Sequence, residues 1–496
     1  MPTTGPAPTG LLPSAGSLVA VPAPRTIRYV GLTGSVLLAL AAYLGGAGYT
    51  RGLSITPARM VEGPYGVLLT ACWLVGTALL IGAWWVGRNV VPSTRWALVT
   101  VALWLAPVLP FLPMGSEDVY SYACQGYVQF AGGDPYAAGP LQQGCPWTDS
   151  VAELWRDSPA PYGPLFLLLA SLAVQVGGSL TGAVVGLRLV AVAGVALTAV
   201  ALPVLARRAG VPPERAVWLA LASPLVLVHL VSGAHNDALM IGLLVSGLAV
   251  AASRRTAGGL FAGSVLVGLA VAVKATAVVV LPFAVLLLVP PGARLRELWR
   301  PAAVATGGLL AAMGAVSALS GRGIGWIAGL SRSGDTIEWT SPSTALGLAV
   351  QYSGRWVGID VQAVSIARAV GVVVLAGVLV ALWWWAQRGH ALLGAGLALA
   401  ATVVLAPVFH PWYATWPLAV LAATWAGDRV TLDRWLLLPC AVAAVLTLPA
   451  GYNLALVTRV QGSLLMTAGM VALAVWTIRR RRTRRHTDTP ALAPAD

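Results

Sequence analysis

The amino-acid sequence predicts an all-α protein that crosses a membrane many times. Its 496 residues are 58% hydrophobic and only 10% charged, and the mean hydropathy is +0.80. A soluble protein of this length is not expected to have so few charged residues. Apolar runs recur along almost the whole chain, separated by short segments that contain the arginines, and this pattern is typical of membrane helices.

The charge and cysteine patterns exclude several classes of function. A net charge of +14 could indicate a nucleic-acid-binding protein, but the arginines lie in short clusters between apolar runs, as in cytoplasmic loops of membrane proteins. We therefore expect no nucleic-acid partner. No P-loop, kinase or GxSxG motif is present, and none of the four cysteines has CxxC spacing. No metal site and no cofactor are predicted.

The local amino-acid composition divides the chain into three predicted regions. Residues 1–24 are rich in Pro, Gly, Thr and Ala, which predicts a disordered N-terminus. Residues 25–478 form the predicted transmembrane domain. Residues 479–496 begin with a basic run and continue rich in Pro and Ala, so we expect a second disordered tail. Both ends are expected in the cytoplasm.

The apolar runs predict about fourteen spans, and their flanking arginines predict the orientation. The runs lie at about 28–48, 66–86, 96–113, 183–206, 216–232, 238–252, 259–290 (two short helices, broken near Lys274), 302–320, 362–386, 391–409, 412–426, 435–450 and 462–478.

The segment 161–178 decides which side the later loops occupy. If it crossed the membrane, the arginine clusters from Arg207 onward would all lie outside, against the positive-inside rule. We therefore interpret it as a helix that lies at the outer interface or dips into the membrane and out again, within one large outer loop from 114 to about 182. Pro161 and Pro164 suit an irregular start to this helix.

The outer loop opens with two adjacent acids, Glu117 and Asp118, directly after an apolar run. Two carboxylates at the end of a membrane helix are unfavourable unless they are solvated or used. One reading is a general base that takes a proton from a hydroxyl group. The other is an interfacial loop with aromatic anchors, and the spacing alone leaves both readings open.

Lys274 is the only lysine in the chain, with no other charged residue within fifteen positions. An ammonium group there must pair with an acid or reach the surface. The functional interpretation is a counter-ion for an anionic group such as a phosphate. The structural alternative is a snorkelling lysine, or one paired with Asp237.

Other polar residues are predicted at the same outer ends of spans. His235, Asn236 and Asp237 lie between two apolar helices, where they could contact a sugar or simply cap a helix. His410 lies among prolines and aromatic residues, as in an interfacial belt, or it could bind a phosphate. A bundle with one outward-facing polar cavity would bring these residues together with the acids.

Several segments resemble the GT-C glycosyltransferases, and most closely the actinobacterial polyprenol-phosphate-mannose-dependent α-1,6-mannosyltransferases. The matching segments are SEDVYSYACQG with DPYAAGP (116–140), PYGPLF (161–166), GAHNDAL (233–239), VKATAVVVLPF (273–283) and FHPWYATWPL (409–418), in the order found in that family. The resemblance implies a GT-C helical bundle with interfacial helices in the first large outer loop.

The resemblance also implies roles for individual residues. Asp118, with Glu117 beside it, matches the family's catalytic base, and Lys274, with His410 or Arg332, is expected to bind the donor phosphate. The residues expected to contact the sugar or the acceptor are Tyr122, Gln125, Tyr162, His235, Asn236 and Asp237.

The implied activity is an inverting transfer of mannose from polyprenyl-phosphate-mannose to an α-1,6-mannan lipoglycan acceptor, on the outer face of the plasma membrane. Besides these two partners, membrane lipid would surround the helices. The alternative is a transporter or flippase of lipid-linked sugars, whose polar groups should lie near the bilayer midplane in repeated halves. No internal repeat is visible in the sequence.

Cys124 and Cys145 both lie in the large outer loop, where an oxidising compartment would permit a disulfide. A bond between them would close a loop of about twenty residues and, in the chain-entropy model, contribute on the order of 3 kcal/mol. Two free thiols are the alternative.

Overall fold

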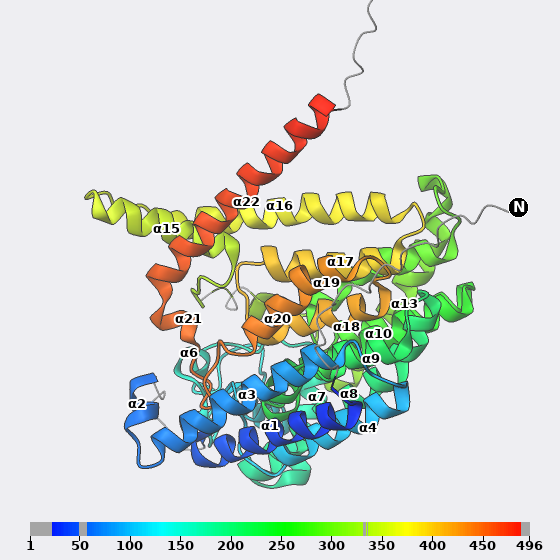
Figure 1. The fold of residues 1–496 in the computed structure, drawn as a ribbon. Coiled ribbons are helices and arrows are strands. Elements are labelled where there is room, and N and C mark those ends of the chain that lie inside the picture. Colours follow the sequence, from blue (N-terminus) through cyan, green and yellow to red (C-terminus); the bar gives the residue numbers. More distant parts are fainter. Residues whose placement is uncertain (1–21, 49–56, 331–333, 335, 488–496) are drawn as a thin grey trace, which may run out of the picture.

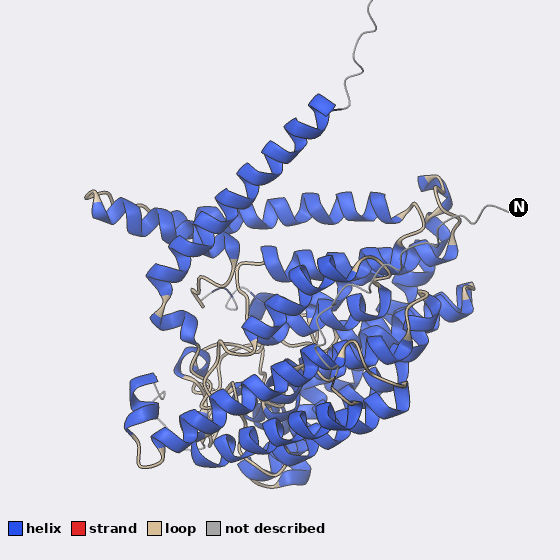
Figure 2. Ribbon diagram, in the orientation of Figure 1, coloured by secondary structure: helices blue, strands red, loops and turns tan. Residues whose placement is uncertain are grey.

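The computed structural model describes residues 22–48, 57–330, 334 and 336–487. Within these ranges the protein consists of helices and loops without a β-strand, and its one strand-like pairing is an antiparallel bridge between Thr447 and Asn453. Figure 2 shows most of the long loops gathered at the left-hand end of a bundle of helices. The all-α prediction is therefore confirmed.

The first half of the chain forms the lower part of the bundle in Figure 1. Here α1 packs against α3, and α10 packs against both α8 and α11. The helices are α1 (Pro24–Gly45), α2 (Pro57–Glu62), α3 (Gly66–Gly87), α4 (Thr94–Leu105), η1 (Ala106–Val108), α5 (Asp118–Phe130), η2 (Thr148–Ser150), α6 (Glu153–Arg156), α7 (Pro164–Gly177), α8 (Leu180–Arg208), α9 (Pro213–Leu221), η3 (Val226–Ser232), α10 (Asp237–Arg254) and α11 (Ala257–Val271).

The second half lies on top of this layer, and α16 and α22 diverge from the bundle at its upper edge (Figure 1). The helices are η4 (Ala275–Val280), α12 (Leu281–Val285), η5 (Leu286–Leu288), η6 (Leu295–Glu297), α13 (Trp299–Ser320), α14 (Trp326–Gly329), α15 (Pro342–Trp356), α16 (Ala363–Ala386), α17 (Ala391–Leu405), η8 (Pro411–Ala414), α18 (Thr415–Thr424), α19 (Arg429–Leu432), η9 (Asp433–Leu437), α20 (Leu438–Ala443), α21 (Leu454–Val457) and α22 (Arg459–Thr487).

Seven helices in the described part of the chain are long and apolar enough to cross a membrane, or eight if the bent pair α9 and η3 forms one span. Five shorter apolar helices accompany them. Every apolar run of the sequence analysis contains helix, but several of these helices are short. The number of fourteen spans therefore stays a prediction.

The predicted break near Lys274 is confirmed. Helix α11 ends at Val271, and η4 begins at Ala275 after an extended Lys274 with φ −149° and ψ 123°. Pro282 follows in α12, so the second part of this run cannot continue as one regular helix. The break exposes backbone groups to which the outer loop attaches.

The outer loop contains a short apolar helix where the sequence analysis expects one. Helix α7 begins at Pro164 and ends before Gly178, which adopts the left-handed conformation with φ +61°. Its 14 residues extend ~21 Å, less than the thickness of a bilayer core. It packs on α5 and α8. Its location at the membrane interface remains a prediction.

The predicted disorder of the C-terminal tail is wrong for its first part. Helix α22 does not stop at the end of the apolar run but continues to Thr487, through the arginine cluster. Arginine is a good helix former, so the helix that begins in the apolar segment can extend through it. Residues 1–21 and 488–496, also predicted to be disordered, lie outside the described residues.

Helices α8 and α10 approach each other closely because glycines face each other between them. A Cβ added to Gly194 would overlap the backbone of Ala238, and one added to Gly242 would overlap the backbone of Gly194. Ala238 lies in the first turn of α10, next to Asp237. The absence of a side chain at Gly194 therefore fixes the position of a polar helix end.

We predict that Gly194→Leu lowers the thermal unfolding midpoint of the detergent-solubilised protein, because the added side chain meets backbone that cannot move aside. Overpacking of this kind commonly costs about 1–3 kcal/mol. The matched control is Gly82→Leu, because a Cβ there meets nothing within 4 Å. Equal midpoints for the two variants would contradict this account of the α8–α10 contact.

Candidate active site

The carboxylate of Asp118 is held at the start of α5. The chain enters this helix through Gly115, which has φ +78° and where a Cβ would press against the ring of His229. Only glycine suits both constraints. The Ser116 hydroxyl then accepts a hydrogen bond of 3.1 Å from the Asp118 N–H. The turn and this bond fix where α5 begins, and therefore where its first acid lies.

A buried histidine faces Asp118. The distance from His235 Nε2 to Asp118 Oδ2 is 3.6 Å, and the His235 side chain is fully buried. Its Nδ1 lies 2.7 Å from the backbone oxygen of His229. A carbonyl oxygen only accepts hydrogen bonds, so Nδ1 must carry the hydrogen. The Nε2 atom therefore meets the carboxylate as a neutral lone pair or as the N–H of an imidazolium.

Two further aromatic rings extend this arrangement. Trp412 lies against His235 with ring centroids 4.1 Å apart, and His410 stacks on Trp412 at 4.6 Å with an interplanar angle of 8°. Burial is the main cause that lowers the pKa of His410 to about 4, and the charge of Lys274 adds to it. His410 is therefore neutral at neutral pH and cannot supply a positive charge.

The environment keeps Asp118 ionised. Burial acts to raise the pKa of its carboxyl group, but interaction with His235 and the charge of Lys274 outweigh burial and lower it below the usual value. An ionised carboxylate has free lone pairs and can accept a proton from a ligand.

Lys274 is held by a buried acid and surrounded by aromatic rings. Its Nζ donates hydrogen bonds to both carboxylate oxygens of Asp237, at 2.9 and 3.0 Å, and Trp416 Nε1 donates to the same carboxylate at 2.6 Å. The ammonium lies 4.6 Å from the ring centre of Tyr413 and 6.0 Å from that of Tyr162. Two of its three N–H groups are thus used, and the third is available to a ligand.

The outer loop reaches Lys274 through the break between α11 and η4. The Gly163 N–H donates to the backbone oxygen of Val273, and Leu165 N–H donates to that of Ala272. A Cβ on Gly163 would overlap the backbone of Ala272. The glycine therefore allows the loop to dock on the broken helix, which carries the neighbouring Tyr162 to the lysine.

Two cavities meet at these residues. One has a volume of about 660 Å³ and the other of about 50 Å³, and both are lined by Asp118, Trp155, His410 and Trp412. Lys274 lines the small cavity and not the large one. Asp118 is thus the acid that borders both spaces, whereas Glu117 lines the large cavity alone.

Four predicted sugar contacts lie behind the cavity wall. Exposed fractions are 1% for Tyr122, 0% for His235, 2% for Asn236 and 0% for Asp237, and none of them lines either cavity. Trp412 packs against His235 at 4.1 Å between ring centroids, and direct contact of these four side chains with a sugar stays a prediction. His235 lies beside Asp118, and Asp237 forms an ion pair with Lys274. Arg332 lies outside the described residues.

The other predicted contacts do line a cavity. Gln125 and Tyr162 border the small space, and Ser121, which the sequence analysis missed, joins them. Asp118, Ser121 and Gln125 are spaced by three and four residues, so they share one face of α5. That spacing was the signal in the sequence. Ser121 Oγ and Gln125 Oε1 are buried without a hydrogen-bond partner, as expected of groups that await a ligand.

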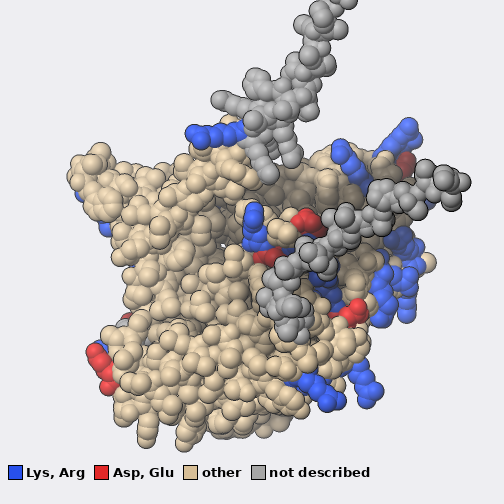
Figure 3. Space-filling model, in the orientation of Figure 1, with Lys and Arg blue, Asp and Glu red and all other residues tan. Residues whose placement is uncertain are grey.

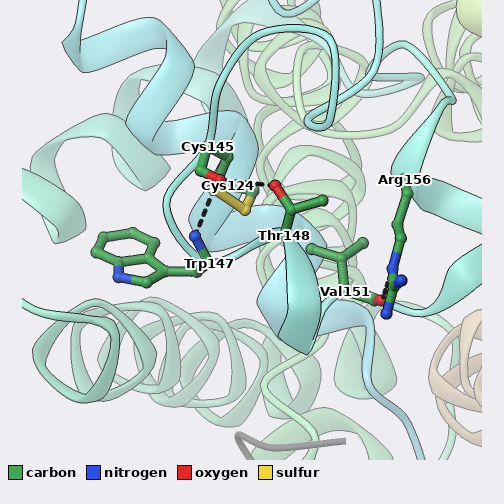
Figure 4. The surroundings of a disulfide bond; sticks show 6 residues. All are labelled: Cys124, Cys145, Trp147, Thr148, Val151 and Arg156. Atoms are coloured by element: carbon green, nitrogen blue, oxygen red, sulfur yellow. Dashed lines mark hydrogen bonds between the residues drawn. A yellow bond between two sulfur atoms is a disulfide. The ribbon is translucent and has the colours of Figure 1, made fainter. Parts of the chain in front are cut away.

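A disulfide joins Cys124 in α5 to Cys145, with Cα atoms 5.5 Å apart. Figure 4 shows the loop beyond it, where the Thr148 hydroxyl donates to the backbone oxygen of Cys145 at 2.6 Å and Arg156 Nε donates to that of Val151 at 3.0 Å. Of the two alternatives for these cysteines, the structure contains the disulfide. It ties to α5 the loop that leads to Trp155.

The part of the chain that the structure describes contains no group of three or more His, Cys, Asp or Glu side chains that could hold a metal ion.

These features together define a polytopic membrane protein whose loops contain a polar cavity. An ionised acid, Asp118, and a cation, Lys274, which is paired with a buried acid, line this part of the protein. Residues 28–290 match the family described as "Alpha-(1->6)-mannopyranosyltransferase, N-terminal domain", and residues 343–483 match the "MptB C-terminal domain". The chain belongs to the α-(1→6)-mannopyranosyltransferase family.

Named relatives agree with this assignment. The chain is 36% identical over 375 residues to alpha-(1->6)-mannopyranosyltransferase A of Mycobacterium tuberculosis, covering 72% of each protein. It is 29% identical to alpha-(1->6)-mannopyranosyltransferase B of Corynebacterium glutamicum, covering 92% of this chain and 83% of that one.

Among solved structures, the chain resembles an oligosaccharyltransferase of Archaeoglobus fulgidus with 16% identity and a TM-score of 0.33. The match covers 71% of this chain and about half (49%) of the other. A score this low carries no argument about fold or function.

We predict that Asp237→Asn destabilises the protein, because it leaves the Lys274 ammonium without its buried counter-ion. Removing one partner of a buried pair costs about 3–5 kcal/mol. The matched control is Asp433→Asn, which breaks the partly exposed pair with Arg88, 3.0 Å apart, and should cost at most about 1 kcal/mol. Thermal unfolding in detergent measures both.

The double variant Lys274→Met/Asp237→Asn provides a second check. It removes both charges, and we expect it to recover most of the stability that Asp237→Asn loses. A double variant as unstable as the single one would contradict the ion pair's role.

Proposed function

We propose that this protein is an inverting membrane mannosyltransferase, which moves mannose from polyprenyl-phosphate-mannose to an α-1,6-mannan lipoglycan acceptor. Membership of the α-(1→6)-mannopyranosyltransferase family supports the transfer of a mannosyl group. The observation that carries the mechanism is the position of Asp118, which borders both the small cavity with Lys274 and the large open one. A base in a single displacement must lie between donor and acceptor.

In this mechanism a hydroxyl oxygen of the acceptor attacks the anomeric carbon of the donor mannose. The new C–O bond forms as the bond between that carbon and the phosphate oxygen breaks, and the hydroxyl proton passes to Asp118. Because Asp118 is weakly basic, the transfer completes late, when the forming bond has made the hydroxyl acidic. His235 packs behind this carboxylate, with its Nε2 3.6 Å away.

The leaving group is polyprenyl phosphate, and Lys274 is our candidate to stabilise its charge. Its third N–H group and its location in the small cavity suit an anionic oxygen. Asp237 holds the ammonium in a fixed position, so little reorganisation is needed when the phosphate departs. His410 is neutral and can contribute a hydrogen bond but no charge.

Surface charge supports an active site on the outer face. Figure 3 shows Lys and Arg side chains gathered mainly toward the right-hand end of the bundle, whereas the long loops of Figure 2 lie toward the left. Positive charge favours the cytoplasmic side. We therefore propose that the right-hand end faces the cytoplasm and that Asp118 acts on the opposite side.

Attack from the face opposite the phosphate inverts the anomeric centre, so a β-linked donor gives an α-linked mannoside. The donor's hydrocarbon tail would remain between helices in the membrane, which explains why an enzyme for a hydrophilic sugar has so apolar a surface.

We predict that Asp118→Asn lowers turnover by about 10²–10⁴-fold, because the amide cannot accept the hydroxyl proton. The assay supplies purified enzyme with labelled polyprenyl-phosphate-mannose and a short α-1,6-mannoside, and the product is analysed by chromatography. The matched control is the adjacent Glu117→Gln, for which we expect activity close to that of the wild type.

Two outcomes would overturn the proposal. If Glu117→Gln were inactive and Asp118→Asn active, the base would be Glu117. If the wild-type enzyme formed no mannoside but moved the lipid-linked sugar across reconstituted vesicles, the protein would be a flippase.

A further inference from the structure

The large cavity has a second wall that the proposed chemistry does not use. It comes from the C-terminal half of the chain, where Glu338, Asn453 and Arg459 all line the 660 Å³ space that Asp118 also borders. Asn453 precedes α21, and Arg459 begins α22. A volume of this size is in the range of ligand-binding pockets, so the wall can contact a substrate of several rings.

Glu338 is built into this wall with a fixed orientation. Its side chain is only 5% exposed, and Asn453 Nδ2 donates a hydrogen bond of 2.6 Å to its Oε2. The Asn453 Oδ1 accepts from the Ala455 N–H at 2.9 Å, which determines the direction of the amide. The Thr340 hydroxyl donates to the same Oε2 at 3.5 Å, so both hydrogen bonds that Glu338 accepts from described side chains go to Oε2 and leave Oε1 for a ligand.

Glu338 has no salt bridge in the described part of the chain, although Arg459 lines the same cavity. Burial raises the pKa of Glu338 to about 7, and the hydrogen bond from Thr340 and the charge of Arg459 lower it only in part. The Arg459 Nε is itself buried without a hydrogen-bond partner. The buried acid and the nearby guanidinium cation form no salt bridge with each other. They therefore leave a hydrogen-bond acceptor and a donor for a bound molecule.

The charge of the cavity indicates what kind of molecule that is. Even without Glu338, the acids in its lining outnumber the arginines, since the acids are Glu117, Asp118, Asp149 and Glu153 and the arginines are Arg156 and Arg459. An anionic group such as a phosphate would be repelled. A neutral molecule rich in hydroxyl groups can donate to the carboxylates and accept from the guanidinium and amide.

Aromatic rings from both halves of the chain also line the large cavity. Trp155, Trp412 and Tyr452 line the same space. An aromatic face suits the apolar C–H surface of a sugar ring, and the polar groups at its rim suit the hydroxyls. Carboxylate, amide, guanidinium and indole therefore occur together as required for binding a neutral glycan.

We propose that Glu338, with Asn453 and Arg459, forms a binding subsite for the acceptor glycan, a neutral α-mannoside whose reacting hydroxyl extends to Asp118. This subsite rests on the proposed mannosyl transfer, since it assigns the large cavity to the acceptor and the space beside Lys274 to the donor. It also makes the C-terminal half of the chain responsible for recognising the acceptor.

The test is a steady-state analysis of Glu338→Gln with the full-length enzyme. The loss of a charge-assisted hydrogen bond of about 1.5–3 kcal/mol should raise the KM for an α-1,6-trimannoside about 10–100-fold, with kcat and the KM for the lipid donor nearly unchanged. The matched control is Glu297→Gln, because Glu297 lies in η6 and lines neither cavity. It should leave all three parameters at wild-type values.

Each outcome decides the inference. A raised donor KM with an unchanged acceptor KM would assign the wall to the donor, and no change in either would remove Glu338 from the binding site. If Glu338→Gln does not fold, Arg459→Gln, at a partly exposed position, is measured in the same way and should also raise the acceptor KM. If the wild-type enzyme transfers no mannose, the proposed function itself fails, which is a different result from a variant effect on an active enzyme.

Discussion

The buried ion pair between Lys274 and Asp237 is the interaction on which the arrangement of the site depends. A lone ammonium among apolar helices is unfavourable, and the chain satisfies it with a carboxylate 2.9 Å away. To reach it, the helix before Lys274 must break, and α10 must begin at Asp237 against Gly194 of α8. The break in turn supplies the backbone groups on which Gly163 and the outer loop dock. One electrostatic requirement therefore brings three distant segments together.

The Asp118 carboxylate is likewise surrounded by buried side chains. His235 lies behind this carboxylate, and the backbone oxygen of His229 determines the tautomer of this histidine. The stack of Trp412 and His410 covers the histidine and separates it from the cavity. Asp118 borders both cavities, whereas His235 behind it lines neither.

Much of this site could be predicted from the sequence, because rare residues are conspicuous in an apolar chain. Asp118 and Lys274 were chosen as candidates in this way, and the break at Lys274 followed from the length of its apolar run. The burial of individual side chains was not predictable. His235 was predicted to contact the sugar, and in the structure it is fully buried against Trp412. Glu338 and Asn453 are 115 residues apart and show no shared spacing, so only the fold reveals their contact.

The most direct measurement of the central claim is a structure of the enzyme with a non-transferable phosphonate analogue of polyprenyl-phosphate-mannose and an α-1,6-mannoside acceptor. The account predicts a phosphonate oxygen about 3 Å from Lys274 Nζ and the acceptor hydroxyl about 3 Å from the Asp118 carboxylate, with the glycan in the large cavity. A phosphonate bound beside Arg459, with the acceptor hydroxyl directed away from Asp118, would contradict it.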